Sequence, residues 1–267
     1  MKIRLGLLSP HSASKEIMIF LKNQDEIKQM KLAGRITGEA LALAGEMVRP
    51  GVTTKQLDNC VRHHIEKCGA KPSFLGYGGF PASACVSVND EVIHGIPSGE
   101  RVLEEGDIVK IDVGAFIGGF HGDSANTFPV GKISEDAAKL IEATKKSFEL
   151  GVLAAAREGA RLGDVGSAID GYVRQFGYST VKEYVGHGVG RELHEEPNVP
   201  NFGTAGRGLR LSRGMTIAIE PMVTVGSPKV KVLENKWTVV TEDGSLSAHY
   251  EHTVALTDDG FILLTKV

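Results

Sequence analysis

Two histidines, His187 and His194, stand seven positions apart in the stretch YVGHGVGRELHEEP. Imidazoles bind metals and transfer protons near neutral pH, so the pair is a candidate for chemistry. One type of zinc protease places two histidines four positions apart on a helix, which is not the spacing found here. Glycines at 186, 188 and 190 also disfavour a helix and suit turns and close backbone approach. The stretch therefore predicts two histidines on an extended, glycine-rich segment.

Four acidic residues lie in strand-like surroundings elsewhere in the chain: Asp112, Asp123, Glu220 and Glu251. Taken singly, such an Asp usually caps a turn, such a Glu faces solvent, and a loop histidine is polar surface. A charged residue inside an apolar strand is nevertheless costly unless it is paired or binds a metal. Four carboxylates with one imidazole form a donor set for two divalent ions, and oxygen-rich sites with one histidine suit Mn, Fe, Co or Zn. The pattern therefore indicates a dinuclear metal site.

An internal repeat relates two of these acidic residues. A shift of 108 residues places RPGVTTKQLDNCVRHHIEKCG (49–69) on REGARLGDVGSAIDGYVRQFG. The same shift places GDIVKIDV (106–113) on GMTIAIEP, so that Asp112 lies over Glu220. Agreement of a helical and a strand segment at one shift indicates a duplicated unit. We expect an α+β fold in which each half has helices followed by an antiparallel sheet, with the strand ends at the centre.

The elements that must position these residues can be predicted from local signals. Long helices are expected over 23–48 and 134–156, and Thr53 with Gln56 forms a capping box for another helix. The glycine pair in FIGGFHG predicts a hairpin between the two aspartates. A turn or bulge there can reset the alternation of the strand, so their odd separation does not force them onto opposite faces.

Composition limits the class of protein. The 267-residue chain is 42% hydrophobic and 24% charged, which is typical of a globular protein. A net charge of −3 gives no basis for broad binding to nucleic acid or anionic membranes, and no apolar run approaches the roughly 20 residues of a membrane span. Three cysteines, an odd number without zinc-finger spacing, indicate a reducing compartment. We expect a flexible leader over 1–17 and a single domain over 18–267, with halves of about 18–133 and 134–267.

Six motifs give the sequence a family resemblance. They are HGIP (94–97), KIDVGAF (110–116), HGDSANTF (121–128), GHGVGRELHEEP (186–197), IEPMV (219–223) and SAHYEHT (247–253). In order and spacing they resemble the bacterial-type methionine aminopeptidases of type I, within the creatinase/aminopeptidase family, over residues 18–267. The resemblance implies a pita-bread fold, with two pseudo-twofold-related α/β halves, an antiparallel sheet and outer helices. It also implies a catalytic domain that hydrolyses the N-terminal methionine from nascent proteins and peptides and prefers a small second residue.

The resemblance further implies roles for single residues. The metal ligands would be Asp112, Asp123, His187, Glu220 and Glu251. They would hold two divalent ions (Co, Mn, Fe or Zn) that activate a water for attack on the scissile carbonyl. Glu220 would accept a proton from that water, His194 would stabilise the oxyanion, and His94 would contact the peptide near the leaving nitrogen. Glu195 and Glu196 are expected to be solvated or structural charges.

An apolar pocket for an unbranched thioether side chain is implied as well. The family's pocket positions correspond to Tyr77, Phe80, Cys85 and Trp237, each of which could equally be ordinary core. Aromatic rings and sulfur make favourable contacts with methionine sulfur. Leu193 stands where an aromatic residue is frequent, and Phe74 stands where a smaller residue is common. These two departures leave the shape of the pocket open.

Related functions compete with this interpretation. Proline-specific metallopeptidases share the fold and ligands but usually carry an additional N-terminal domain, for which only a short segment precedes the first long helix. Type II enzymes carry an insertion, whereas the stretch between His194 and Glu220 is short. Eukaryotic type I enzymes carry a zinc-binding extension, and no cysteine precedes Cys60. A non-catalytic ribosome- or RNA-binding relative would lose ligands and gain basic surface.

The expected partners follow from the implied reaction. We expect nascent polypeptides and peptides as substrates, with transient ribosome contact. We expect a cytoplasmic monomer with no membrane partner and no specific nucleic-acid partner. The identity of the metal is not determined by the sequence.

Overall fold

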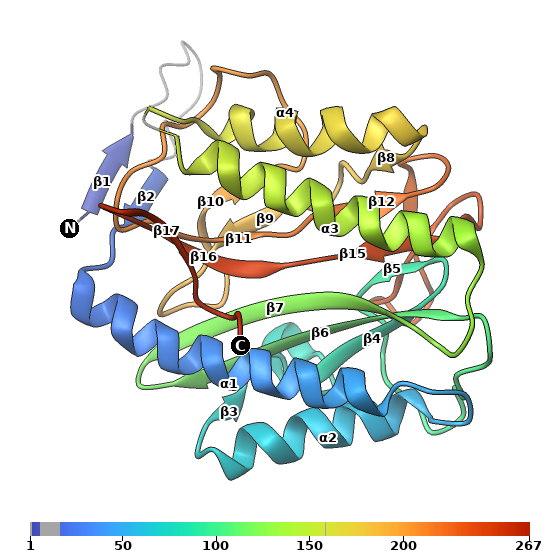
Figure 1. The fold of residues 1–267 in the computed structure, drawn as a ribbon. Coiled ribbons are helices and arrows are strands. Elements are labelled where there is room, and N and C mark those ends of the chain that lie inside the picture. Colours follow the sequence, from blue (N-terminus) through green and yellow to red (C-terminus); the bar gives the residue numbers. More distant parts are fainter. Residues whose placement is uncertain (1, 6–16, 158) are drawn as a thin grey trace.

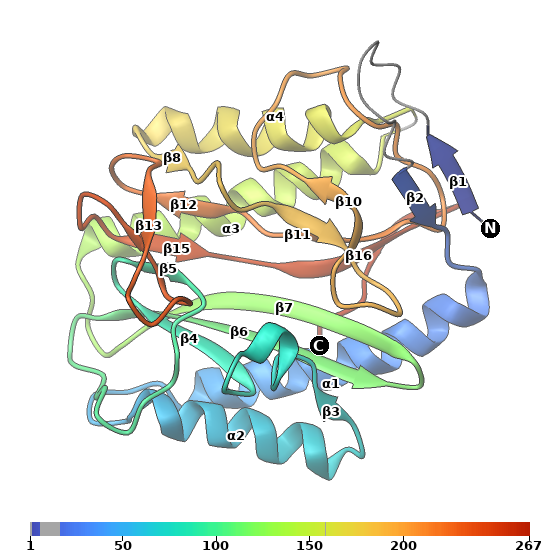
Figure 2. The same ribbon diagram turned by 180° about the vertical axis from the view of Figure 1, so that it is seen from behind.

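Two pairs of helices flank the antiparallel strands of the chain in the computed structural model, which describes residues 2–5, 17–157 and 159–267 (Figures 1 and 2). The helices are α1 (Gln24–Met47), α2 (Thr54–Lys67), α3 (Glu135–Ala155) and α4 (Leu162–Val173), with short 3-10 helices η1 (Tyr77–Gly79) and η2 (Arg174–Phe176). The α1 helix packs on β6 and β7 and the α2 helix on β4, while α3 packs on β12 and β15. The predicted α+β fold with outer helices is confirmed.

The strands of the first half are β1 (Lys2–Leu5), β2 (Ile17–Phe20), β3 (Lys71–Pro72), β4 (Ala84–Val88), β5 (Glu91–Ile93), β6 (Ile108–Ile117) and β7 (Phe120–Pro129). Those of the second half are β8 (Ser179–Thr180), β9 (Gly186–Gly188), β10 (Glu195–Val199), β11 (Thr216–Ile219), β12 (Met222–Thr224), β13 (Val230–Val232), β14 (Val239–Thr241), β15 (Ser247–His249), β16 (His252–Thr257) and β17 (Gly260–Leu263). The pairings between these strands are antiparallel.

The helices begin where the sequence provides caps. The Asn23 side chain accepts backbone N–H bonds at the start of α1, and Glu26 bonds back to the Asn23 N–H. Thr53 and Gln56 form the predicted capping box of α2. These reciprocal bonds satisfy N–H groups that have no partner within the helix. The predicted helices over 23–48 and 134–156 are confirmed as α1 and α3.

The repeat is visible in the cores beneath the helices. Leu57, Val61 and Ile65 of α2 are fully buried, and so are Val165, Ile169 and Val173, which lie 108 residues later on α4. The α2 residues pack with β4 and β6, while Val165 and Ile169 pack with β11 and β16. Equivalent helices thus bury equivalent apolar faces, which explains why the shift of 108 residues holds in both helix and strand.

The longest hairpin carries both predicted aspartates. Strands β6 and β7 pair along their whole length, with Asp112 on β6 and Asp123 on β7. Their turn is Gly118–Gly119, with φ of 62° and 84°. This left-handed conformation costs glycine little and matches the twist of a two-residue hairpin. The predicted hairpin is confirmed.

The matching ladder of the second half is interrupted. Strand β11 pairs with β16 and β12 pairs with β15 in one common register, but Glu220 and Pro221 between β11 and β12 belong to neither strand. Proline has no N–H to donate to a ladder, which accounts for the break. Within the segment 214–221, β11 ends at Ile219, so Glu220 lies directly after the strand end.

The predicted leader is described only in part. Met1 and residues 6–16 lie outside the described residues, whereas Lys2–Leu5 pairs with Ile17–Phe20 as β1 and β2. The boundary at residue 18, the flexible leader and the single two-half domain stay predictions. Within the described ranges, no helix combines the length and apolar character that crossing a membrane requires.

Candidate active site

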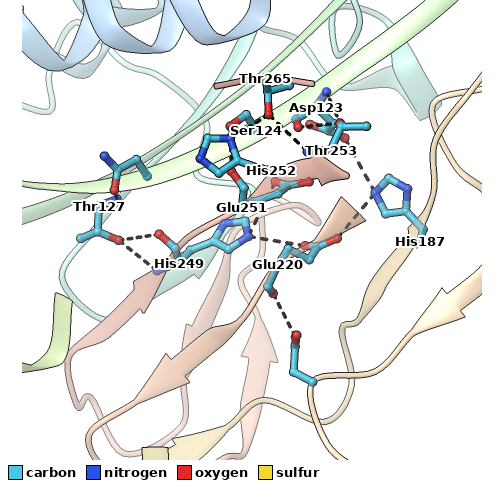
Figure 3. Close-up of polar contacts among 12 residues, drawn as sticks. Asp123, Ser124, Thr127, His187, Glu220, His249, Glu251, His252, Thr253 and Thr265 are labelled. Atoms are coloured by element: carbon cyan, nitrogen blue, oxygen red, sulfur yellow. Dashed lines mark hydrogen bonds and ion pairs between the residues drawn. The ribbon is translucent and has the colours of Figure 1, made fainter. Parts of the chain in front are cut away.

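Carboxylates from both ladders converge where the ladders meet (Figure 3). Asp123 pairs with Gly114, which lies two residues from Asp112 on β6, so both aspartates point to one face of the hairpin. The common register of the second ladder places Glu220 opposite Glu251, within the interruption. The structure thus brings together all four acidic residues that the sequence singled out.

Side-chain hydroxyls link the two ladders beside these carboxylates. Ser124 Oγ donates to the Glu251 carbonyl oxygen at 2.7 Å. Thr253 Oγ1 donates to the Asp123 carbonyl oxygen at 2.8 Å and accepts the Asp123 N–H at 3.0 Å. All three bonds are buried, so the backbone at Asp123 and Glu251 is fixed from the opposite half of the molecule.

His187 joins the carboxylates from β9, the extended segment that the glycines predicted. Its Nδ1 lies 2.8 Å from the Gly188 carbonyl oxygen. Because a carbonyl only accepts, Nδ1 carries the proton and Nε2 presents a lone pair. That Nε2 lies 3.7 Å from Asp123 Oδ2 and 3.5 Å from Glu220 Oε1. Burial lowers the pKa of His187 to about 3, so the ring is neutral and able to donate its lone pair.

The glycines around His187 allow close packing of neighbouring strands. A Cβ at position 186 would lie 2.3 Å from the Ala218 carbonyl oxygen, and one at 188 would lie 2.4 Å from the Glu196 carbonyl oxygen. Any side chain at these two positions would therefore push β9 away from its neighbours. The space that these glycines leave is taken by protein backbone, which holds His187 in place.

Several buried polar atoms of this cluster have no hydrogen-bond partner among the residues that the structure describes. They are Asp112 Oδ1, Asp123 Oδ1, Glu251 Oε1 and both ring nitrogens of His249. Burial raises the pKa of Asp112 to about 7 and that of Glu220 to about 8. Burial also raises the pKa values of Asp123 and Glu251 well above their usual range. A bound cation reverses this situation, because its charge favours ionised carboxylates and its empty orbitals use the free lone pairs. The residues therefore fit a metal centre.

Two groups of three side chains have the spacing of metal donors. One group is Asp112, His249 and Glu251, and the other is Asp123, His187 and Glu251, each with its donor atoms within 4.8 Å of one another. Glu251 belongs to both groups. A shared carboxylate is the arrangement expected when two ions lie side by side.

His249 is a site residue that the sequence analysis missed. It lies on β15 in the SAHYEHT motif, where the analysis named only Glu251 as a ligand. Burial lowers the pKa of His249 to about 4, so the ring is neutral. The spacing of two residues from Glu251 was the available signal, because residues i and i+2 of a strand share a face.

The second predicted histidine, His194, lies beside the first. The His187 and His194 rings are 4.1 Å apart between centroids, and His194 Nδ1 lies 2.8 Å from the Tyr77 hydroxyl. His94 is mostly buried against the Tyr184 ring, at 5.9 Å between centroids, and burial lowers its pKa to about 4. Both histidines line the same cavity as the carboxylates.

A buried ion pair holds the loop that carries His194. Glu195 Oε1 accepts the backbone N–H groups of Arg191 and Glu192 at 2.8 and 3.3 Å. Its Oε2 lies 2.5 Å from Lys22 Nζ, and both side chains are more than 90% buried. Glu195 is therefore a structural charge, which was one of the two expectations for it.

Comparison with known proteins places the chain in a family. The model of metallopeptidase family M24 matches residues 28–258. The chain belongs to metallopeptidase family M24. It is 56% identical to a methionine aminopeptidase of Clostridium acetobutylicum, over 93% of this chain and 99% of that protein. It is also 51% identical to methionine aminopeptidase 1 of Bacillus subtilis, over 94% of this chain and 100% of that protein.

Solved structures agree with this M24 assignment. A methionine aminopeptidase of Thermotoga maritima superimposes with a TM-score of 0.91 at 46% identity, covering 94% of this chain and 100% of that one. A prolidase of Pyrococcus furiosus superimposes with a TM-score of 0.74 at 25% identity, covering 92% of this chain and 65% of that one. The pita-bread fold implied by the sequence is confirmed.

A cavity of about 300 Å³ opens beside the carboxylates of this M24 metallopeptidase. Its lining includes every residue predicted for the pocket, namely Tyr77, Phe80, Cys85, His94, His194 and Trp237. The Phe80 and Trp237 rings meet edge to face at 5.2 Å, and Cys85 pairs with Asp112 across β4 and β6. Phe74 and Leu193, the two departures from the family pattern, also line it and are buried. The structure thus gathers the predicted site residues, while their individual roles stay predictions.

Proposed function

We propose that this metallopeptidase removes the N-terminal methionine from peptides and newly made polypeptides, with a preference for a small second residue. The observation that carries the proposal is the position of Glu251 in two groups of buried donors, next to an apolar cavity. The names of the two relatives reported above, at 56% and 51% identity, support the same reaction. The proposal includes a cytoplasmic monomer that meets its substrates near the ribosome.

The donor set suits two divalent cations. Asp112, Asp123, Glu220 and Glu251 would together carry four negative charges, which two divalent ions balance. His187 would add an imidazole, and this mixture of oxygen and nitrogen donors suits Co, Mn, Fe or Zn. When bound, such ions would polarise a carbonyl and lower the pKa of a water towards about 7.

The protein's own residues would bind the peptide and move its protons. Glu220 faces both histidines of the donor groups and is the best-placed carboxylate to accept a proton. When the Tyr77 hydroxyl donates to Nδ1 of His194, Nε2 of that ring carries a proton and can donate to an oxyanion. Loss of one such donor costs roughly 3–4 kcal/mol of transition-state stabilisation in other enzymes. His94 would contact the peptide near the leaving nitrogen.

The cavity explains the choice of methionine. It is lined by aromatic rings and the Cys85 thiol, which make favourable contacts with a thioether. Burial raises the pKa of that thiol well above its usual range, so Cys85 stays a neutral, apolar wall. An unbranched side chain can enter such a cavity, whereas a charged one would lose its hydration without a partner.

The test measures methionine release from Met-Ala-Ser and Met-Leu-Ser. Metal-stripped protein is supplied with Co, Mn, Fe or Zn separately, and an Ala-Pro peptide serves as the substrate of a proline-specific enzyme. We expect metal-dependent cleavage of Met-Ala-Ser and little cleavage of the other two. Cleavage of Ala-Pro alone would replace the proposal with a proline-specific peptidase. No cleavage by folded, metal-loaded protein would leave a binding function for the ribosome or RNA.

A further inference from the structure

We propose that Glu39, His64 and Cys68 form a Zn²⁺ site on the outer helices, separate from the carboxylate cluster. Outside that cluster, they are the one group of three metal donors found among the residues that the structure describes, with donor atoms within 4.8 Å of one another. Glu39 belongs to α1, while His64 lies in the last turn of α2 and Cys68 is the C-cap of that helix. A bound ion would therefore join the two helices that cover the first half (Figures 1 and 2).

The two helices hold these donors in fixed positions. His64 and Cys68 are four positions apart, which places them one above the other on the same face of α2. The helices pack through the apolar core of the first half, which includes Ile36 of α1 and Ile65 of α2, and Cys68 packs at the edge of that core. Donors on rigid, packed elements need little rearrangement to bind an ion.

The distances between the donor atoms match those around one Zn²⁺. His64 Nε2 lies 3.2 Å from Glu39 Oε2 and 3.6 Å from Cys68 Sγ. In a tetrahedral site, a nitrogen and an oxygen ligand are about 3.3 Å apart, and a nitrogen and a sulfur ligand are about 3.6 Å apart, because Zn–N and Zn–O are about 2.0–2.1 Å and Zn–S is about 2.3 Å. Both contacts therefore have the spacing of ligands to a shared ion.

Hydrogen bonding alone does not explain this arrangement. The single atom Nε2 of His64 faces both a carboxylate oxygen and a free thiol. If Nε2 carries a proton, it can donate to Glu39 and has no lone pair for the thiol proton. If Nε2 is unprotonated, it can accept from Cys68, but its lone pair then faces the lone pairs of Glu39. A metal ion removes this conflict, because it accepts a lone pair from each of the three atoms.

The donor types select the ion. Thiolate and imidazole suit Zn²⁺, whereas Mg²⁺ and Mn²⁺ prefer oxygen ligands. One thiolate and one carboxylate balance two positive charges, and the C-terminal end of α2 adds a partial negative charge. Glu39 Oε1 lies 3.6 Å from Arg35 Nε, which leaves Oε2 for the ion. The side chains of Glu39 and His64 are 36% and 18% exposed, so an ion can enter from solvent and water can fill the fourth position.

The experiment adds Co²⁺ to metal-stripped protein as a coloured substitute for Zn²⁺ and records the near-ultraviolet spectrum. A bond between Co²⁺ and a thiolate gives an intense charge-transfer band, which carboxylate and imidazole ligands do not give. The variants are Cys68→Ser and His64→Gln. The matched controls are Cys60→Ser and His63→Gln, which remove the same side chains from the same helix outside the donor group.

We expect the band in the parent protein and in both controls, and excess Zn²⁺ should remove it by displacing Co²⁺. In Cys68→Ser the band should be absent. In His64→Gln the Co²⁺ concentration that gives half of the band should rise at least about tenfold, since even an outer-shell partner contributes about 10–100-fold. No band in the parent, or a band that survives Cys68→Ser, would overturn the proposal, and a surviving band would point to Cys85 of the cavity.

Alkylation of the cysteines measures the same site without colour. At a free Zn²⁺ concentration about ten times the Kd, about nine tenths of the sites are filled, so alkylation of Cys68 should slow about tenfold. Alkylation of Cys60 should not change. Equal rates for Cys68 with and without Zn²⁺ would overturn the proposal. The site does not depend on the proposed reaction, so a protein that released no methionine would still show protection of Cys68.

Discussion

Each half supplies two carboxylates, but the strands that carry them are continuous in one half and interrupted in the other. In the first half, Asp112 and Asp123 lie inside an unbroken hairpin that a two-glycine turn closes. In the second half, Glu220 and Glu251 lie in the gap of an interrupted ladder. The strands that flank this gap are further joined by a long excursion over residues 225–246, where the first half has only Gly118–Gly119.

Because the second ladder is interrupted, the backbone of Glu220 and Glu251 is hydrogen-bonded to groups outside that ladder. The Glu220 carbonyl accepts a bond from Asn201 Nδ2 at 2.9 Å. Glu251 exchanges backbone bonds with Ala125 of β7, at 2.8 and 3.3 Å. The aspartates pair within their own ladder, and Thr253 of the other half also binds the Asp123 backbone, whereas both backbone bonds of Glu251 come from the other half. The first half therefore carries its two aspartates on a continuous hairpin, and the site is complete only where the two halves join.

The shared position of Glu251 predicts the largest effect. Glu251→Gln keeps the size of the side chain but removes a carboxylate from both donor groups, whereas Asp112→Asn alters only one. We expect Glu251→Gln to lower kcat/KM by more than about 100-fold, because loss of an outer-shell partner alone costs about 10–100-fold. Metal analysis should show both ions weakened in Glu251→Gln and one in Asp112→Asn. Equal loss of a single ion in both variants would contradict the sharing of Glu251.

The ion pair between Lys22 and Glu195 predicts the next effect. Lys22 precedes α1 in the first half, and Glu195 belongs to the His194 loop of the second. Lys22→Met would leave a buried carboxylate without its partner, so we expect the free energy of unfolding to fall by about 3–5 kcal/mol. Urea unfolding measures this change. The control is Lys146→Met, which breaks an exposed, solvent-screened pair with Glu149 and should change the free energy of unfolding far less. Equal costs would show that the buried pair does not join the halves.

Sequence reasoning succeeded where local signals and the repeat were sufficient. The capping residues Asn23 and Thr53 mark helix starts without any tertiary information, and a two-glycine turn specifies a hairpin. The repeat related Asp112 to Glu220 because both halves bury the same apolar faces. The closeness of Asp112 and Glu220 could thus be anticipated from the repeat, whereas the pocket residues came only from the family resemblance.

What the sequence did not predict depends on long-range contacts. The break after Ile219 was missed, although Pro221 was a local warning. The Lys22–Glu195 pair joins residues 173 positions apart, and no periodic pattern relates them. His249 was overlooked because a histidine in a strand is usually paired with the protein. Only the three-dimensional structure shows that its ring nitrogens have no hydrogen-bond partner within the described ranges.

Metal removal should reveal the cost of burying these carboxylates in their charged form. In the metal-free protein the folded-state pKa values of Asp112 and Glu220 are raised to about 7 and about 8, above their ordinary values of 3.8 and 4.5. At a pH between the unfolded and the folded pKa values, the unfolded chain has released protons that the folded protein keeps. The free energy of unfolding therefore falls as pH rises from about 4 to about 8. Thermal unfolding across this range measures the fall. It should be shallower in Asp112→Asn, which cannot titrate, and added Co²⁺ should abolish it. A metal-free stability that rises over this range would contradict the prediction.

The excursion that distinguishes the second half predicts the smallest effect. It carries Trp237, whose ring meets Phe80 of the first half edge to face at 5.2 Å over the cavity. Aromatic pairs contribute about 0.5–1.5 kcal/mol, so Trp237→Ala should raise KM for Met-Ala-Ser about 2- to 12-fold. The value of kcat should change less, because the role proposed for this ring is contact with the side chain of the substrate and not with the scissile bond. Trp237→Phe keeps an aromatic wall and should retain most of the affinity. A fall in kcat with KM unchanged would instead place Trp237 at the reacting centre. Residues 225–246 would then help to position the reacting groups.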